Sequence, residues 1–203
     1  MSNELKAAIR HDNIHHMIAL TCAPLLAGIK ISNLYLARKN DFIDIAEALD
    51  GTAISMFVLS ENSERTAVFL YEPVKLQEYL KRRDVISFLK KIGYSCTEIR
   101  PVLKRLSDRY RSYLSGEEEF PHELGILLGY PLGDVYGFMK NKGKNYIFSG
   151  YWKVYTEPEY ARRIFKKYDI VTELLIGHAI NGKTIKDIAG MFRKRSVLYG
   201  LVS

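Results

Sequence analysis

The chain has 203 residues, of which 47% are hydrophobic and 12% aromatic, a composition that can fill a core and favours a folded protein over an intrinsically disordered one. Thirty lysines and arginines against 23 acidic residues give a net charge of +7, which favours anionic partners such as small anions, acidic proteins or nucleic acid. The longest apolar run, residues 17–29, contains Thr21 and Pro24 and is shorter than the ~20 residues of a membrane span, so none is predicted.

The first part of the chain mixes helical and β-like patterns. A helix is predicted from Glu4 to about Leu20, and Pro24 and Gly28 are expected to end it. Runs rich in β-branched and aromatic residues then predict three strands, with turn residues between the last two that indicate a hairpin. The strands are predicted at residues 29–36, 53–59 and 66–71, with a short helix at 42–49.

The second part is mainly helical by its periodicity. From Pro73 to Gly93 the period is helical, and further helices are predicted at 97–114, 121–128, 134–141, 158–180 and 185–195. Residues 146–155 are aromatic and β-like, so they are expected to add a strand. We therefore expect an α+β fold with a small sheet of three to four strands and a mainly helical C-terminal half. Residues 1–203 should form a single compact unit, with a possible subdivision into an α/β part, 1–95, and a mainly helical part, 97–203.

The densest local signal is the segment 120–155, which reads FPHELGILLGYPLGDVYGFMKNKGKN and then, after a short gap, SGYWKVY. Pro121 presets a first helical turn, which puts His122 where backbone N–H groups have no partner. A helix N-terminus lowers the pKa of an imidazole and attracts anions. His122 is thus a candidate acid, base or anion clamp, and the alternative is a histidine that only caps or packs.

The motifs FPHELG, LGYP and GYWKVY, the Asn-Lys-Gly-Lys-Asn turn, and CAPLLAGIK near the start make this chain similar to a family of uncharacterised, mainly clostridial proteins, domain of unknown function 3793. The resemblance covers nearly the whole chain and implies a bacterial protein. It implies no activity, cofactor or substrate. Residues 147–149 depart from it, because cysteines are expected there in many relatives and Ile, Phe and Ser stand here, which puts a metal or cluster role in doubt.

A basic turn lies in the same segment, formed by Lys140, Lys142 and Lys144 around Gly143, and it leads into Trp152. Lysines, free backbone N–H groups and an aromatic face together can hold a phosphate and a planar ring, although a surface turn before a buried strand has the same pattern. Our leading hypothesis is a binding or regulatory module for a small anionic or aromatic ligand. The predicted ligand-binding residues are His122, Glu123, Tyr130, Asp134, Lys144, Trp152 and Lys153.

A thiol-dependent enzyme is a second hypothesis. Cys22 is followed by Ala23 and Pro24, so it is expected near a helix end, where a thiolate can be stabilised, and with His122 it would make a catalytic pair. A buried, inert thiol is the alternative. Cys22 and Cys96 form no CxxC pattern, which indicates reduced thiols and, with the polar N-terminus, a cytoplasmic location.

A nucleic-acid-binding protein is a third hypothesis, in which residues 123–141 form a helix-turn-helix-like unit. The second helix of that unit opens with Gly133 and Asp134 and lacks Arg, Gln or Asn at its start, which weakens base reading. His11 and His15 are spaced for one helix face, but no further ligands accompany them, so no metal site is predicted.

Overall fold

The structure of the chain is a computed structural model that describes the backbone of residues 1–199 and their side chains except those of Asn40 and residues 193–199. Its first half contains helices, one 3-10 turn and three strands. They are α1 (Asn3–Ala7), α2 (Ile14–Leu26), β1 (Ser32–Arg38), the 3-10 turn (Lys39–Asp41), α3 (Phe42–Leu49), β2 (Ser55–Glu61), β3 (Arg65–Tyr71), α4 (Pro73–Leu80) and α5 (Arg83–Lys91).

The second half is mainly helical, with one small hairpin. It contains α6 (Ile99–Leu114), α7 (Glu123–Leu127), α8 (Leu132–Lys140), β4 (Phe148–Ser149), β5 (Lys153–Val154), α9 (Pro158–Ile180) and α10 (Ile185–Tyr199). The α+β fold class is therefore confirmed, as are the three predicted strands and the hairpin between β2 and β3. Residues 146–155 do form strands, but β4 and β5 pair with each other in a separate two-stranded sheet.

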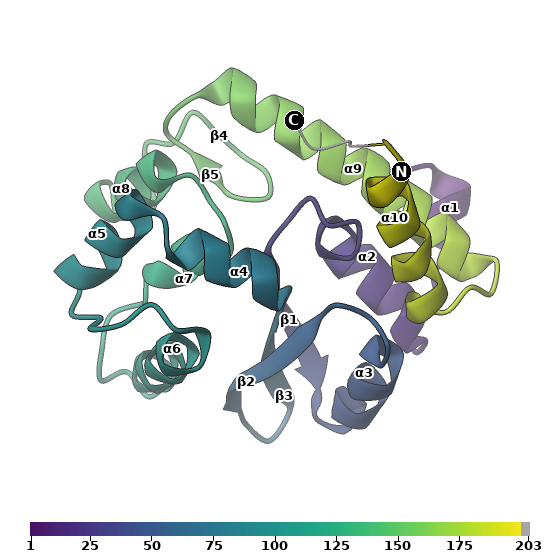
Figure 1. The fold of residues 1–203 in the computed structure, drawn as a ribbon, viewed down its shortest axis with the longest axis horizontal. Coiled ribbons are helices and arrows are strands. Elements are labelled where there is room, and N and C mark those ends of the chain that lie inside the picture. The colour runs from purple at the N-terminus through teal and green to yellow at the C-terminus, as the bar shows by residue number, and fades with distance from the viewer. Residues whose placement is uncertain (200–203) are drawn as a thin grey trace.

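The central strand of the main sheet is β3, which pairs antiparallel with β1 on one side and β2 on the other. Successive side chains of a strand point to opposite faces. Val68 and Leu70 accordingly pack into a core with α2, α3, α9 and α10, whereas Ala67 and Phe69 pack into a second core with α4 to α8. The sheet is thus covered by helices on both faces (Figure 1).

A third, smaller cluster lies between the β4–β5 hairpin and the first half of α9. Trp152, Val154, Ala161 and Tyr168 are its buried members, and Phe165 packs against them. The Trp152 and Phe165 rings meet edge to face, with centroids 4.5 Å apart. This cluster fixes the hairpin beside α7 and α8, where the candidate site lies.

The N-terminal helix differs from its prediction. The chain turns at residues 8–13, and a new helix starts after Asn13, whose side chain accepts hydrogen bonds from the N–H groups of His15 and His16. Asn is a strong N-cap, so the predicted single helix is two. The prediction that Pro24 ends the helix is also wrong, because α2 runs through Pro24 to Leu26. Among the residues described, no helix combines the length and hydropathy that crossing a membrane requires.

Candidate functional site

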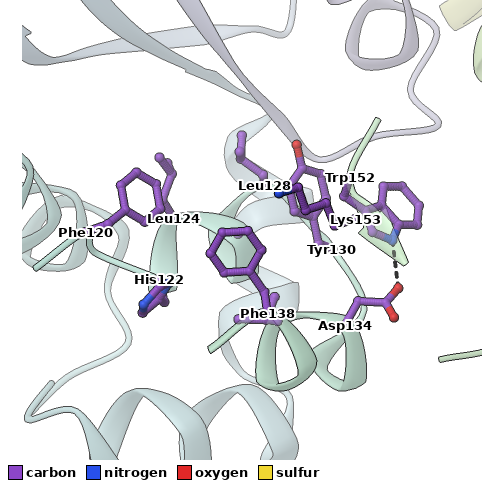
Figure 2. Close-up of a pocket in the computed structure, with 11 residues that line it drawn as sticks. Phe120, His122, Leu124, Leu128, Tyr130, Asp134, Phe138, Trp152 and Lys153 are labelled. Atoms are coloured by element: carbon purple, nitrogen blue, oxygen red, sulfur yellow. Dashed lines mark hydrogen bonds between the residues drawn. The ribbon is translucent and has the colours of Figure 1, made fainter. Parts of the chain in front are cut away.

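A cavity of about 290 Å³ lies between α7, α8 and the β4–β5 hairpin. Figure 2 shows Phe120 and His122 at one end of this cavity, Phe138 between them and the other end, and Tyr130 and Trp152 at that other end. Its wall is predominantly apolar and aromatic. Ligand cavities are usually ~300–1,000 Å³, so this one is sized for a ligand of one or two rings.

His122 is the N-cap residue of α7, and its half-buried imidazole lies between two rings of the wall. The ring centroids of Phe120 and Phe138 are 5.7 Å and 5.6 Å from that of His122, both in edge-to-face geometry. Burial lowers the pKa of His122 below its ordinary 6.5, while the carboxylates of Glu123 and Glu119 oppose the shift. In the described part of the chain the imidazole contacts aromatic rings, and no hydrogen bond contributes to its pKa shift. The neutral ring can therefore donate a hydrogen bond to a ligand through one nitrogen or accept one from it through the other.

Asp134 is buried in the wall and is fully engaged by the hairpin. Its Oδ2 accepts a hydrogen bond from Trp152 Nε1 at 2.7 Å, and its Oδ1 accepts from the backbone N–H groups of Tyr155 and Thr156 at 2.8 Å and 2.7 Å. The Thr156 hydroxyl donates a further bond to Oδ1 at 2.9 Å. Asp134 therefore holds Trp152 and the end of the hairpin against α8, a positioning role.

Two glycines of α8 make this approach possible. A Cβ on Gly133 would lie 2.8 Å from Thr156 Oγ1, and a Cβ on Gly137 would lie 2.4 Å from the ring of Tyr155. Gly133 and Gly137 are four residues apart, so they form one flat face of the helix. That face lets the backbone at residues 155–156 come close enough for its N–H groups to donate hydrogen bonds to Asp134.

The two predicted lysines have different positions. Lys153 lines the cavity, and its ammonium donates to the Gly143 carbonyl at 2.8 Å and lies 5.6 Å and 5.0 Å from the ring centroids of Phe138 and Tyr146. An ammonium has three N–H donors, so Lys153 keeps donors for an anion. Lys144 is exposed and does not line the cavity.

Glu123 lies in α7 but away from the cavity. Its carboxylate is buried, accepts a hydrogen bond from the Tyr94 hydroxyl at 3.0 Å and forms an ion pair with Arg109 Nε at 2.9 Å. This pairing joins α7 to α6 and to the turn after α5. Of the predicted residues, the structure thus gathers His122, Tyr130, Asp134, Trp152 and Lys153 around one cavity and leaves Glu123 and Lys144 outside it.

Cys22 lies in another part of the molecule. It is fully buried in the core of α2, α3, α9 and α10, whereas Phe120, which contacts His122, packs against the core on the other face of the sheet. Burial raises the pKa of the Cys22 thiol, and hydrogen bonds with Thr21 and Asn33 only partly oppose this. No contact among the described residues joins Cys22 to His122. The catalytic pair therefore stays a prediction from the sequence alone.

Sequence reasoning missed Lys30, which is buried near Cys22. Its Nζ donates to Asn33 Oδ1 at 2.6 Å, and the amide of the same Asn33 donates to Cys22 Sγ at 3.3 Å. The ammonium also lies 5.5 Å from the ring centroid of Tyr130, a residue of the cavity wall. Burial lowers the pKa of Lys30 to about 8. The signal was available in CAPLLAGIK, where a lysine follows an apolar run.

The predicted helix-turn-helix corresponds to α7 and α8. Four of the five residues of α7 are buried, and the exposed residues of α8 are Gly133, Tyr136 and Lys140. In a helix-turn-helix protein the first helix crosses the DNA backbone and the second enters the major groove, which requires both to be accessible. Here both helices use their side chains mainly to form the core and the cavity.

The described residues contain no group of three or more His, Cys, Asp or Glu side chains placed to hold a metal ion. His15, one of the two histidines considered above, accepts a hydrogen bond on Nδ1 from the backbone N–H of Ile185 at 3.3 Å. Its role in the structure is to join α2 to the start of α10.

Comparison with known proteins identifies a family. A family model described as protein of unknown function, DUF3793, matches residues 18–189, a range that includes both CAPLLAGIK and the whole cavity segment. No curated protein and no solved structure matches the chain. The resemblance found in the sequence motifs is thus confirmed over most of the chain, which belongs to the DUF3793 family of proteins of unknown function.

Proposed function

We propose that this protein binds a small planar aromatic anion, such as an aromatic carboxylate, in the cavity between α7, α8 and the β4–β5 hairpin. The observation that carries the proposal is an aromatic-walled cavity of about 290 Å³ with one lysine, Lys153, among its described lining residues. Aromatic rings prefer edge-to-face and offset contacts, which Phe120, Phe138 and Trp152 offer to an incoming ring.

The polar groups set the orientation of such a ligand. Lys153 has unused N–H donors for a carboxylate, and the neutral imidazole of His122 supplies a second hydrogen bond. Asp134 is already engaged by four donors, so its charge is largely compensated and repels the anion less. Binding and regulation suit this site, because the described residues that line the cavity offer ring contacts and hydrogen-bond donors to a ligand.

The only tryptophan of the chain, Trp152, lies in the cavity wall, so its fluorescence reports on the cavity alone. We expect cinnamate, an aromatic carboxylate, to quench Trp152 emission in a saturable manner. The K153M variant should bind cinnamate at least ~10-fold more weakly, because a charge-assisted hydrogen bond contributes about 1.5–3 kcal/mol. The neutral amide, cinnamamide, should lose little affinity in that variant.

The matched control is K144M, which removes a lysine of the same turn that does not line the cavity and should leave cinnamate binding unchanged. F138A should weaken cinnamate and cinnamamide alike, because it removes a ring of the wall. Equal losses in K144M and K153M, or no saturable quenching by either compound, would contradict the proposal.

A further inference from the structure

The positive charge of this protein is concentrated in one segment. Residues 81–111 contain ten lysines and arginines and three acidic residues, an excess of seven that equals the net charge of the whole chain. The remaining residues contain twenty basic and twenty acidic side chains and are neutral as a set. The anion-attracting field of the molecule therefore originates from α5, α6 and the turn between them.

Most of these basic side chains are exposed on α5 and α6, which lie on the opposite side of the molecule from α10 (Figure 1). Arg100, Lys104 and Arg111 are four and then seven residues apart, so they lie along one face of α6. With a rise of about 1.5 Å per residue, they are spaced about 6 Å and 10 Å along the helix axis. They form a regular row of positive charge.

Arg105 connects this row to the end of α5. Its guanidinium lies 3.4 Å from the carbonyl oxygen of Ile92 and 5.0 Å from the ring centroid of Tyr94, in the turn that follows Lys90 and Lys91. We call the exposed residues that form this region the basic surface. They are Lys90, Lys91, Arg100, Lys104, Arg105 and Arg111.

The basic surface is not neutralised within the protein. In the described part of the chain, Arg82 pairs with Asp84, Arg109 with Glu123 and Arg111 with Asp108. Lys90, Lys91 and the three remaining members of the surface on α6 have no carboxylate partner there. Like charges in one region repel and destabilise the folded state, so the fold itself gives no reason for this arrangement.

The surface also lacks apolar groups. Within residues 81–111 no large hydrophobic side chain is exposed. The exposed ones nearest in the sequence are Val74 and Tyr113, and the exposed Tyr136 of α8 meets Phe88 of α5 with ring centroids 5.4 Å apart. A lipid-binding helix inserts an apolar face, a single-strand binder stacks bases on aromatic rings, and a protein interface has an apolar centre. Residues 81–111 offer none of these features, so the basic surface recognises a partner chiefly through its negative charge.

From these features we infer that the basic surface binds the phosphate backbone of double-stranded nucleic acid without reading its sequence. Such contacts come from arginines and lysines, and they position a protein on a duplex without specifying bases. The contact region is thus α5 and α6, and not the helix-turn-helix-like segment 123–141. It is also separate from the aromatic cavity.

The test compares two variants that remove the same charge. One carries K90Q, K91Q, R100Q and K104Q in the basic surface, and the other carries R162Q, R163Q, K166Q and K167Q, four exposed basic residues of α9. Binding of a fluorescent DNA duplex and of an RNA duplex of the same sequence is measured by anisotropy between about 50 and 200 mM salt. Circular dichroism verifies that both variants are folded.

We expect the basic-surface variant to lose at least ~10-fold in affinity at the lowest salt, with a salt slope reduced by about 0.9 for each lost phosphate contact. The α9 variant should change less than about threefold. Equal losses in both variants would mean that only net charge matters and would overturn the inference. It would also be overturned by tighter binding to single strands, or by binding to phosphatidylserine vesicles without binding to either duplex.

Discussion

Lys30 is the one buried lysine or arginine in the described part of the chain, and no carboxylate there pairs with it. Taking an ammonium out of water favours its neutral form, which is why the pKa of Lys30 is lowered to about 8 from its ordinary 10.5. The nearby thiol does not compensate, because burial raises the pKa of Cys22 and keeps it neutral. Lys30 therefore costs stability whenever it is protonated in the folded state.

This cost predicts a pH dependence of stability. Below about pH 8 the lysine is protonated in both the folded and the unfolded states, so it does not make the free energy of unfolding depend on pH. Between about pH 8 and 10.5 the unfolded chain holds the proton that the folded chain has lost, so the free energy of unfolding should rise with pH. In urea unfolding, the difference between wild type and K30M should increase by about 2–3 kcal/mol across this range, at about 1.4 kcal/mol for each pH unit.

Buried tyrosines act in the opposite direction at higher pH. Burial raises the pKa of Tyr35 and Tyr79 to about 12, so the folded state retains protons that the unfolded state loses, and stability should fall above about pH 10. Wild type and K30M share this fall in stability, so the difference between their free energies of unfolding isolates the contribution of Lys30. A difference that stays constant up to pH 10.5 would contradict a buried, uncompensated ammonium.

At the same scale, residue chemistry predicted the site only in part. His122, Trp152 and Lys153 were found because their types and their place near turns indicate binding. Phe120 and Phe138 line the cavity equally, but an aromatic residue in a helical pattern has the same sequence signal in a core as in a cavity wall. Whether Glu123 and Asp134 face a cavity or a partner depends on residues far along the chain, such as Arg109, which no local pattern identifies.

At the scale of elements, most helices and strands followed from periodicity, and α3 and α9 were predicted with the bounds that they have. The errors concern the bounds of α2 and the pairing of β4 with β5. Asn13 starts α2 by accepting two backbone hydrogen bonds, and the helix tolerates Pro24 in its interior. Strand pairing of β4 with β5 depends on the packing of Trp152 and Phe165, a tertiary contact.

The packing of α8 against the hairpin leads to a prediction about its glycines. Replacing glycine by alanine within a helix normally stabilises it by about 0.5–1 kcal/mol. In G137A, however, the new methyl group would meet the Tyr155 ring at 2.4 Å, and overpacking of this kind costs about 1–3 kcal/mol. We therefore expect G137A to lower the free energy of unfolding in urea by about 1–2 kcal/mol.

Gly177 of α9 is the matched control, because a Cβ there would meet no atom within 4 Å. G177A should raise the free energy of unfolding by about 0.5–1 kcal/mol, since only the helix propensity changes. If G137A were as stable as G177A, the hairpin would not be packed directly on α8, and the positioning role of Asp134 would be lost with it.

At the scale of the whole molecule, the cores on the two faces of β3 join the first half of the chain to the second. One core combines β1 and α2 from the first half of the chain with α9 and α10 from the second, and the other combines β2 and α4 with α6 and α7. The Ser32 hydroxyl also donates across the halves to the Leu127 carbonyl, at 2.5 Å. Both of the larger cores are thus shared between 1–95 and 97–203, and only the small cluster around Trp152 lies within one part, which favours a single unit over the subdivision.

We therefore expect the chain to unfold in one cooperative transition. Trp152 reports on the second half, whereas Ile18 is fully buried in α2 in the first half. Ile to Ala in a core costs about 2–5 kcal/mol. In a single unit, I18A should shift the urea midpoint of Trp152 fluorescence as far as that of far-ultraviolet circular dichroism. If the chain consisted of two independent units, the Trp152 transition would stay at its wild-type midpoint while only part of the dichroism moved to lower urea.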